Sequence, residues 1–134
     1  LLLASVLAVH PEVLVLDEPV SAMDPDGAHA LYKLLYKIYK EYHMTVIVVE
    51  HNINFLLPYA TNMIVMNKGK VAAQGTFEEA AAIAYEMPEL RQNLPELWQV
   101  KLALENRFGI ALGAWRNEED ALKELQEKFV GGGL

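Results

Sequence analysis

Two adjacent carboxylates follow a short apolar run and are the clearest chemical feature of the sequence. Residues 13–16 read Val-Leu-Val-Leu, and Asp17 and Glu18 come directly before Pro19. The run predicts a strand that is buried on both faces, and the proline ends its hydrogen-bond ladder. Because successive strand residues point to opposite sides, the two acids are expected to have different roles. Acids at the carboxyl end of a strand suit a ligand site in an α/β sheet.

The residue types at positions 17 and 18 indicate two kinds of chemistry. One carboxylate can hold a hard cation such as Mg²⁺, which takes few protein carboxylates and keeps several waters. The other can orient or deprotonate a water molecule at the reacting group. The alternative is that both acids are only solvated residues at a strand end.

A helix and a second apolar strand are expected after this site. Asp24 followed by a proline is a helix start, with the aspartate as N-cap. The apolar stripe of that helix is expected at residues spaced by three and four, namely Leu31, Leu34, Leu35, Ile38 and Tyr42. The second buried strand covers residues 44–49, and His51 follows it. An imidazole there can donate a hydrogen bond to a phosphate and respond to its loss, although a histidine after a strand is more often structural.

Three motifs, in order, resemble those of ABC-type ATPases. Residues 14–19 (LVLDEP) look like the Walker B motif, residues 21–24 (SAMD) like the D-loop, and residues 46–51 (VIVVEH) like the strand leading to the switch histidine. The resemblance implies an α/β fold: the C-terminal part of a P-loop NTPase (RecA-like) parallel sheet with flanking helices, followed by a small helical extension.

The resemblance also implies a role for each motif residue, with ATP and Mg²⁺ as the cofactors. Asp17 would hold Mg²⁺ through water, and Glu18 would polarise the attacking water. Ser21 and Asp24 would lie at the nucleotide site and meet a second ATPase subunit, in a homodimer or a heterodimer. His51 would contact the γ-phosphate. Asp24 can also be simply the helix cap, and the two roles are compatible.

The later part of the chain predicts a hairpin and then short helices. Apolar runs at 62–66 and 70–74 flank an Asn-Lys-Gly turn, and Thr76 can form a capping box with Glu79 at the start of a helix over 77–85. The layout after Thr76 resembles the helical extension of energy-coupling-factor ATPases, which serve importers of cobalt, nickel and vitamins. We therefore expect an ATPase core over residues 1–76 and a helical extension over 77–134.

Composition narrows the range of partners and compartments. The 134 residues carry a net charge of -7 and no cysteine, so neither nucleic-acid binding nor disulfide chemistry is expected. The first nine residues resemble the body of a helix rather than a signal peptide. The resemblance implies a transmembrane transporter subunit as partner and a peripheral place on the inner, cytoplasmic face of the cell membrane.

The phosphate-binding loop of ABC ATPases does not occur in this sequence. No Gly-x-x-x-x-Gly-Lys run is present, so we interpret the chain as part of a nucleotide-binding domain. Two rival interpretations are a non-catalytic interaction module and an ABC-type ATPase that acts in repair or translation rather than transport. The family arrangement also places the phosphate-loop strand between the strands at 44–49 and 62–66, which predicts a vacant slot about 10 Å wide there.

Overall fold

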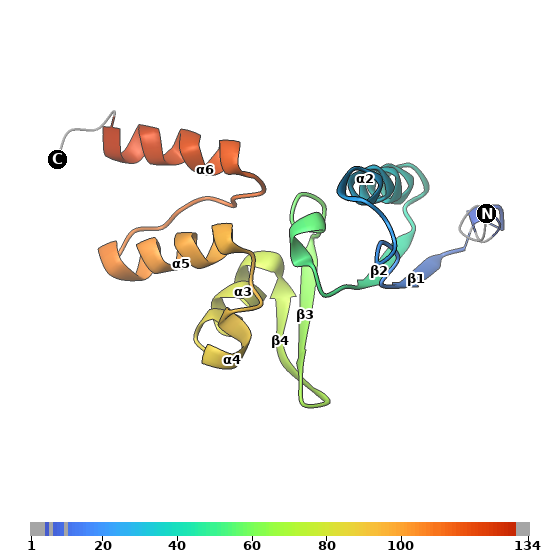
Figure 1. Ribbon diagram of the computed structural model, residues 1–134, viewed down its shortest axis with the longest axis horizontal. Coiled ribbons are helices and arrows are strands. Elements are labelled where there is room, and N and C mark those ends of the chain that lie inside the picture. Colours follow the sequence, from blue (N-terminus) through green and yellow to red (C-terminus); the bar gives the residue numbers. More distant parts are fainter. Residues whose placement is uncertain (1–4, 6, 10, 131–134) are drawn as a thin grey trace. The chain divides into compact units, whose positions relative to one another are not determined.

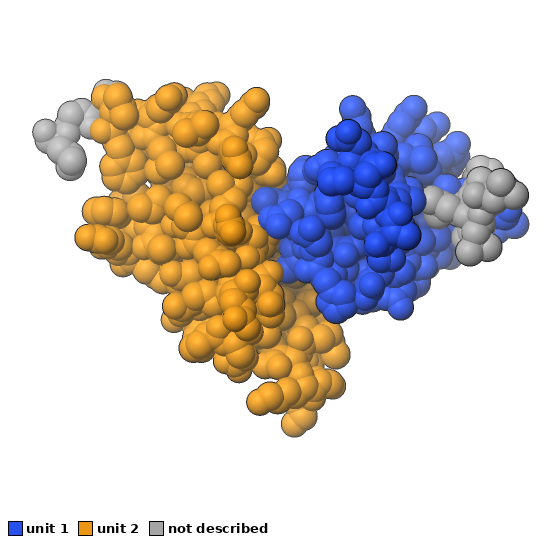
Figure 2. All heavy atoms as spheres, in the orientation of Figure 1, with its two compact units in different colours: residues 1–59 blue, residues 60–134 orange. Residues whose placement is uncertain are grey.

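The computed structural model describes residues 5, 7–9 and 11–130 of the chain. They form two compact units, Leu1–Tyr59 and Ala60–Leu134, coloured separately in Figure 2. His10 and the glycine-rich end at 131–133 lie outside the described residues, as does most of the helix expected over 1–9. Among the described residues, no helix has both the length and the apolar character that crossing a membrane requires.

The first unit is a parallel strand pair joined by one long helix. β1 (Val13–Asp17) pairs with β2 (Thr45–Val49), and α2 (Pro25–Tyr42) connects them. Figure 1 shows α2 on one side of this pair. The short 3₁₀ helix η1 (Ile53–Phe55) follows β2. This is the expected strand-helix-strand order.

The ends of α2 follow the capping rules that its sequence predicts. The Asp24 carboxylate accepts the hydrogen bond of the Gly27 N–H at 2.7 Å, and Pro25 occupies the first helical position. His43 ends the helix in a left-handed conformation, with φ 52°. The buried core of the unit combines residues of α2 with residues from the strands and loops: Leu14, Val20, Ala28, Tyr32, Leu35 and Met44.

The prediction that both strands are buried on two faces is wrong for this chain. Leu14 faces the core and is buried, whereas Val15 is 63% exposed and its register partner Ile47 is 47% exposed. The reason is the alternation of the pleat: α2 packs on one face, and the opposite face keeps its valines and isoleucine in solvent. Two residues of the expected helix stripe, Leu34 and Tyr42, are also exposed, and both line a groove of about 730 Å³.

The second unit begins with the predicted hairpin. β3 (Asn62–Asn67) pairs antiparallel with β4 (Lys70–Thr76), with one irregularity between Val65 and Met66. Lys68 and Gly69 form the turn with φ of 49° and 75°, the signs that a type I′ turn requires. In the described residues, β2 and β3 belong to separate two-stranded sheets, and the width of the expected slot between them stays a prediction.

In the part of the chain that the structure describes, four helices and a π-helical turn follow the hairpin. They are α3 (Phe77–Tyr85), α4 (Pro88–Arg91), α5 (Glu96–Phe108), α6 (Glu118–Leu125) and η2 (Gln126–Val130). The predicted capping box is present: the Thr76 hydroxyl accepts from the Glu79 N–H at 3.2 Å, and the Glu79 carboxylate accepts from the Thr76 N–H at 2.9 Å. The predicted division after Thr76 falls inside the second unit, at the junction of β4 and α3.

Buried aromatic rings hold the helices of the second unit together. Phe77 and Trp98 meet edge to face with ring centroids 5.0 Å apart, and Trp98 and Trp115 are 0% and 1% exposed. The Trp98 indole donates to the Trp115 carbonyl at 2.8 Å, and the Trp115 indole donates to Glu124 at 2.8 Å. Both tryptophans are therefore packing residues.

Glu124 links α6 through hydrogen bonds to the segment that contains Gly113 and Trp115. Its carboxylate also accepts from the Gly113 N–H, at 2.9 and 3.0 Å, and pairs with Lys128 at 3.2 Å. Burial raises the pKa of Glu124, but the hydrogen bonds from Trp115 and Gly113 and the Lys128 ammonium outweigh it and hold the pKa below its ordinary value.

Candidate functional site

The two adjacent acids lie where β1 ends and the chain turns away from the sheet. Asp17 is the last residue of β1 and is exposed. Glu18 has a left-handed backbone, with φ 43°, and its N–H donates to the Val49 carbonyl at 2.9 Å. Such a φ is unusual for a residue with a side chain, so the turn sets Glu18 apart from the regular alternation of the strand.

The strand-helix-strand unit brings Glu18 together with His51. His51 Nε2 lies 2.8 Å from Glu18 Oε1, with side chains that are 86% and 43% exposed. The two residues follow neighbouring parallel strands at their carboxyl ends, which is why a separation of 33 positions in sequence becomes a direct contact. An acid and an imidazole at this distance can exchange a proton or orient a common water molecule.

A third carboxylate, Glu50, supports the segment that carries His51, a role that was not predicted from the sequence. Its Oε2 accepts from the Tyr32 hydroxyl at 2.7 Å, and its Oε1 accepts from the N–H groups of His51 and Asn52 at 3.1 and 3.3 Å. Burial, and then the hydrogen bond to Glu50 and its charge, raise the pKa of Tyr32. This tyrosine in α2 could have indicated a partner, because a buried tyrosine hydroxyl needs a hydrogen-bond acceptor.

The segment between β1 and α2 is a compact turn with exposed side chains. The Ser21 N–H donates to the Glu18 carbonyl at 3.2 Å, and the Met23 N–H donates to the Val20 carbonyl at 2.9 Å. Ser21 and Asp24 are exposed. Asp24 has the cap role described for α2, and the contact of this segment with a second subunit stays a prediction.

The carboxylate oxygens of Asp17 could bind Mg²⁺ in a site that has few protein ligands. Among the described residues, no group of three or more His, Cys, Asp or Glu side chains could enclose a metal ion. Mg²⁺ at phosphate-transfer sites typically takes one or two carboxylates, with waters and substrate phosphates as its other ligands. A single exposed aspartate next to a general-base candidate fits that arrangement.

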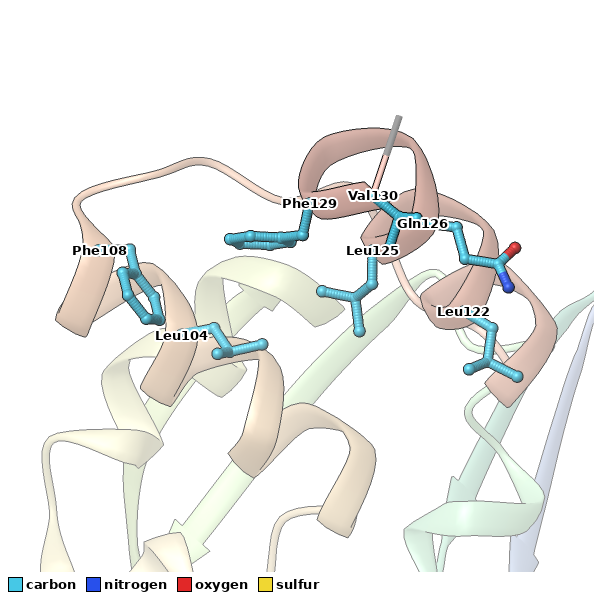
Figure 3. A pocket seen from close by; sticks show the side chains of 7 residues that line it. All are labelled: Leu104, Phe108, Leu122, Leu125, Gln126, Phe129 and Val130. Carbon is cyan, nitrogen blue, oxygen red and sulfur yellow. The ribbon is translucent and has the colours of Figure 1, made fainter. Parts of the chain in front are cut away.

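An apolar groove of about 400 Å³ lies in the second unit, between α5 and the α6–η2 segment (Figure 3). Its lining is apolar except for one glutamine: Leu104, Phe108, Leu122, Leu125, Gln126, Phe129 and Val130. None of these side chains carries a charge that could bind a phosphate or a metal. This groove therefore offers no group for that chemistry, and the predicted site residues all lie in the first unit.

Sequence comparisons with known proteins show the family of the chain. No family model matches the chain. The chain is 42% identical over 132 residues to the energy-coupling factor transporter ATP-binding protein EcfA2 of Bacillus cereus, covering 98% of this chain and 45% of that protein. It is 37% identical over 131 residues to EcfA2 of Halalkalibacterium halodurans, covering 94% and 46%. The chain belongs to the ABC-type ATPases.

Solved structures agree with this assignment. The cbiO1 protein from Clostridium perfringens, part of the ABC transporter complex cbiONQ, is 35% identical with a TM-score of 0.55, covering 73% of this chain and 39% of that chain. The ADP conformation of MJ1267, an ATP-binding cassette of an ABC transporter, has a TM-score of 0.58 at 24% identity, covering 68% and 35%, and supports the fold alone. The predicted P-loop NTPase fold class and the energy-coupling-factor resemblance are confirmed. The chain spans about half the length of the curated relatives it matches.

Proposed function

We propose that this chain contributes the hydrolytic half of a site in an ATPase subunit that powers substrate import through a membrane ABC transporter. The observation that carries the proposal is the 2.8 Å contact between Glu18 and His51, at the carboxyl ends of two parallel strands. The two relatives named above are both energy-coupling factor transporter ATP-binding proteins, which supports transport over a role in repair or translation.

In this proposal the residues divide the work of phosphoryl transfer to water. Glu18 accepts a hydrogen bond from the attacking water and takes its proton as the water attacks the γ-phosphorus, while the bond from this phosphorus to the ADP oxygen breaks and ADP leaves. His51 donates a hydrogen bond to a γ-phosphate oxygen, where negative charge is concentrated. Asp17 would hold Mg²⁺ through water, and this ion would neutralise charge on the phosphate oxygens.

The proposed partners follow from the family. The exposed segment Ser21–Asp24 would contact a second ATPase subunit. ATP hydrolysis would drive conformational changes in a transmembrane subunit. The ATPase subunit would then sit on the inner face of the cell membrane. The division into an ATPase core, 1–76, and a helical extension, 77–134, belongs to the same proposal.

The decisive experiment is carried out on the full-length protein that contains this chain. Glu18→Gln keeps the shape of the side chain and removes the base, so ATP should still bind while kcat falls by about 10² or more. Asp17→Asn should raise the Mg²⁺ concentration needed for half-maximal activity. Glu12→Gln, the same change outside the site, is the matched control. Parental turnover in Glu18→Gln would refute the assigned role.

A second candidate function is a non-catalytic interaction module, and the Gly-x-x-x-x-Gly-Lys loop of ABC ATPases does not occur in these 134 residues. Under either proposal the isolated chain should bind Mg-ATP poorly, because most of the phosphate contacts of ABC ATPases come from that loop. Calorimetric titration of Mg-ATP into the 134-residue chain is the measurement, and binding at micromolar affinity would contradict both. Hydrolysis by the full-length protein would exclude the interaction module.

A further inference from the structure

The His51 side chain is mostly in solvent, so few packing contacts fix its position. It is 86% exposed, and the interaction that fixes its ring is the 2.8 Å contact with Glu18. A side chain in solvent has many rotamers available, so its position depends on how firmly its backbone is held. The groups that fix the backbone at His51 therefore decide where the imidazole lies.

Glu50 is the group that fixes this backbone. One oxygen of its carboxylate accepts the N–H groups of His51 and Asn52, and the other accepts the hydroxyl of Tyr32. Hydrogen bonds to an ionised acceptor are stronger than neutral ones, and three donors on one carboxylate restrict its rotation. Tyr32 itself is 2% exposed and lies in the core of the unit, so it is a rigid anchor.

The other end of the segment after β2, at Phe55, also contacts α2. The Phe55 ring meets His29 edge to face at 5.1 Å and stacks with Tyr32 at 6.4 Å. The Asn52 side chain caps η1 by accepting from the Asn54 N–H at 3.2 Å. Both ends of the stretch from Glu50 to Phe55 thus contact α2.

We propose that Glu50, anchored by Tyr32, is a positioning residue that fixes the His51 backbone so that its imidazole meets Glu18. The inference deepens the proposed function and rests on it for its catalytic consequence. Because Asp24 caps the same helix that carries Tyr32, the link also ties the turn at Ser21–Asp24 to the histidine. Neither Tyr32 nor Glu50 touches the reacting atoms in this scheme.

The first test measures the backbone directly in the 134-residue chain. Tyr32→Phe removes one hydroxyl and keeps the ring, so the fold should remain. Amide hydrogen exchange, followed by NMR, should become about tenfold faster at His51 and Asn52, the factor expected for losing one hydrogen bond to a charged group. Exchange within β2 should be unchanged. Tyr36→Phe, on the same helix but in contact with Tyr39 and Tyr59, is the matched control and should exchange like the parent.

The second test measures turnover in the full-length protein. Tyr32→Phe and Glu50→Gln should each lower kcat about tenfold and leave the KM for ATP within about twofold, since positioning acts on the chemical step. Tyr36→Phe should keep the parental kcat. If the parental protein hydrolyses no ATP, the proposed function fails, and the exchange measurement alone decides the positioning role. Unchanged exchange at His51 and Asn52 in both Tyr32→Phe and Glu50→Gln would overturn the proposal.

Discussion

The β1–α2–β2 unit and the helices around Trp98 differ in how completely they bury their apolar side chains. Trp98 and Trp115 are almost fully buried, and each indole N–H has an acceptor within the same unit. Val15 and Ile47, at the centre of the parallel pair, keep 63% and 47% of their surface exposed. The proposed catalytic residues thus lie in the less completely buried unit, whereas the second unit encloses its own core. This contrast predicts where substitutions cost stability and where they do not.

The largest effect is expected at the centre of the enclosed region. Trp98→Ala removes a ring that packs on Phe77 and leaves a cavity, so it should cost about 3–5 kcal/mol of unfolding free energy. Amide exchange in the 134-residue chain should show the loss across α3 and α5, with β1 and β2 unchanged. An equal loss of protection in β1 and β2 would contradict the contrast between the regions.

A smaller effect is expected when acid removes the charge of Glu124. Its folded-state pKa is below the ordinary value of 4.5, so its contribution to stability is complete above that value. It is lost as the pH falls below 4.5 and passes through the folded-state pKa. Urea unfolding at about pH 6 and at about pH 3.5 measures this loss. Glu124→Gln is the control and should lose less stability over the same interval; a parallel loss would remove Glu124 as the cause.

The N-cap of α2 should contribute about 1 kcal/mol to the first unit. Asp24→Ala removes the acceptor of the Gly27 N–H, whereas Asp24→Asn keeps an acceptor oxygen. Thermal unfolding followed by circular dichroism should rank the parent and Asp24→Asn close together and Asp24→Ala below them. Equal losses in both variants would mean that charge, rather than the cap hydrogen bond, stabilises this end of α2.

The smallest effect is expected on the exposed face of β1. Val15→Thr should change the unfolding free energy by less than about 0.5 kcal/mol, since the site is largely in solvent. Leu14→Ala, one residue earlier but buried, should cost about 2–5 kcal/mol. Val15→Thr should also reduce aggregation of the chain, measured by light scattering, because it interrupts an exposed apolar strand. A large destabilisation by Val15→Thr would show that this face is covered in solution.

Much of the fold could be predicted because its signals are local. The cap at Asp24, the capping box at Thr76 and the turn at Gly69 each depend on residues within a few positions, and all three are present. The approach of Glu18 and His51 was also predictable, because parallel strands align their carboxyl ends.

The remaining features depend on tertiary contacts that composition and periodicity do not encode. A run of four apolar residues indicates a buried strand but does not say whether one or two layers cover it, so Val15 was placed in a core it does not have. The hydrogen bond between Tyr32 and Glu50 joins residues 18 positions apart, one in α2 outside the predicted apolar stripe and one directly after β2. Neither position signals the other in the sequence.

The left-handed backbone of Glu18 has a consequence for protein engineering. At φ 43° a glycine would fit without the steric cost that any side chain carries. Selection for heat resistance alone would therefore favour glycine at this position and would discard the carboxylate that meets His51. If Glu18 acts as proposed, stability and turnover favour different residues at this position, and a thermostable version of the protein has to keep Glu18 unaltered.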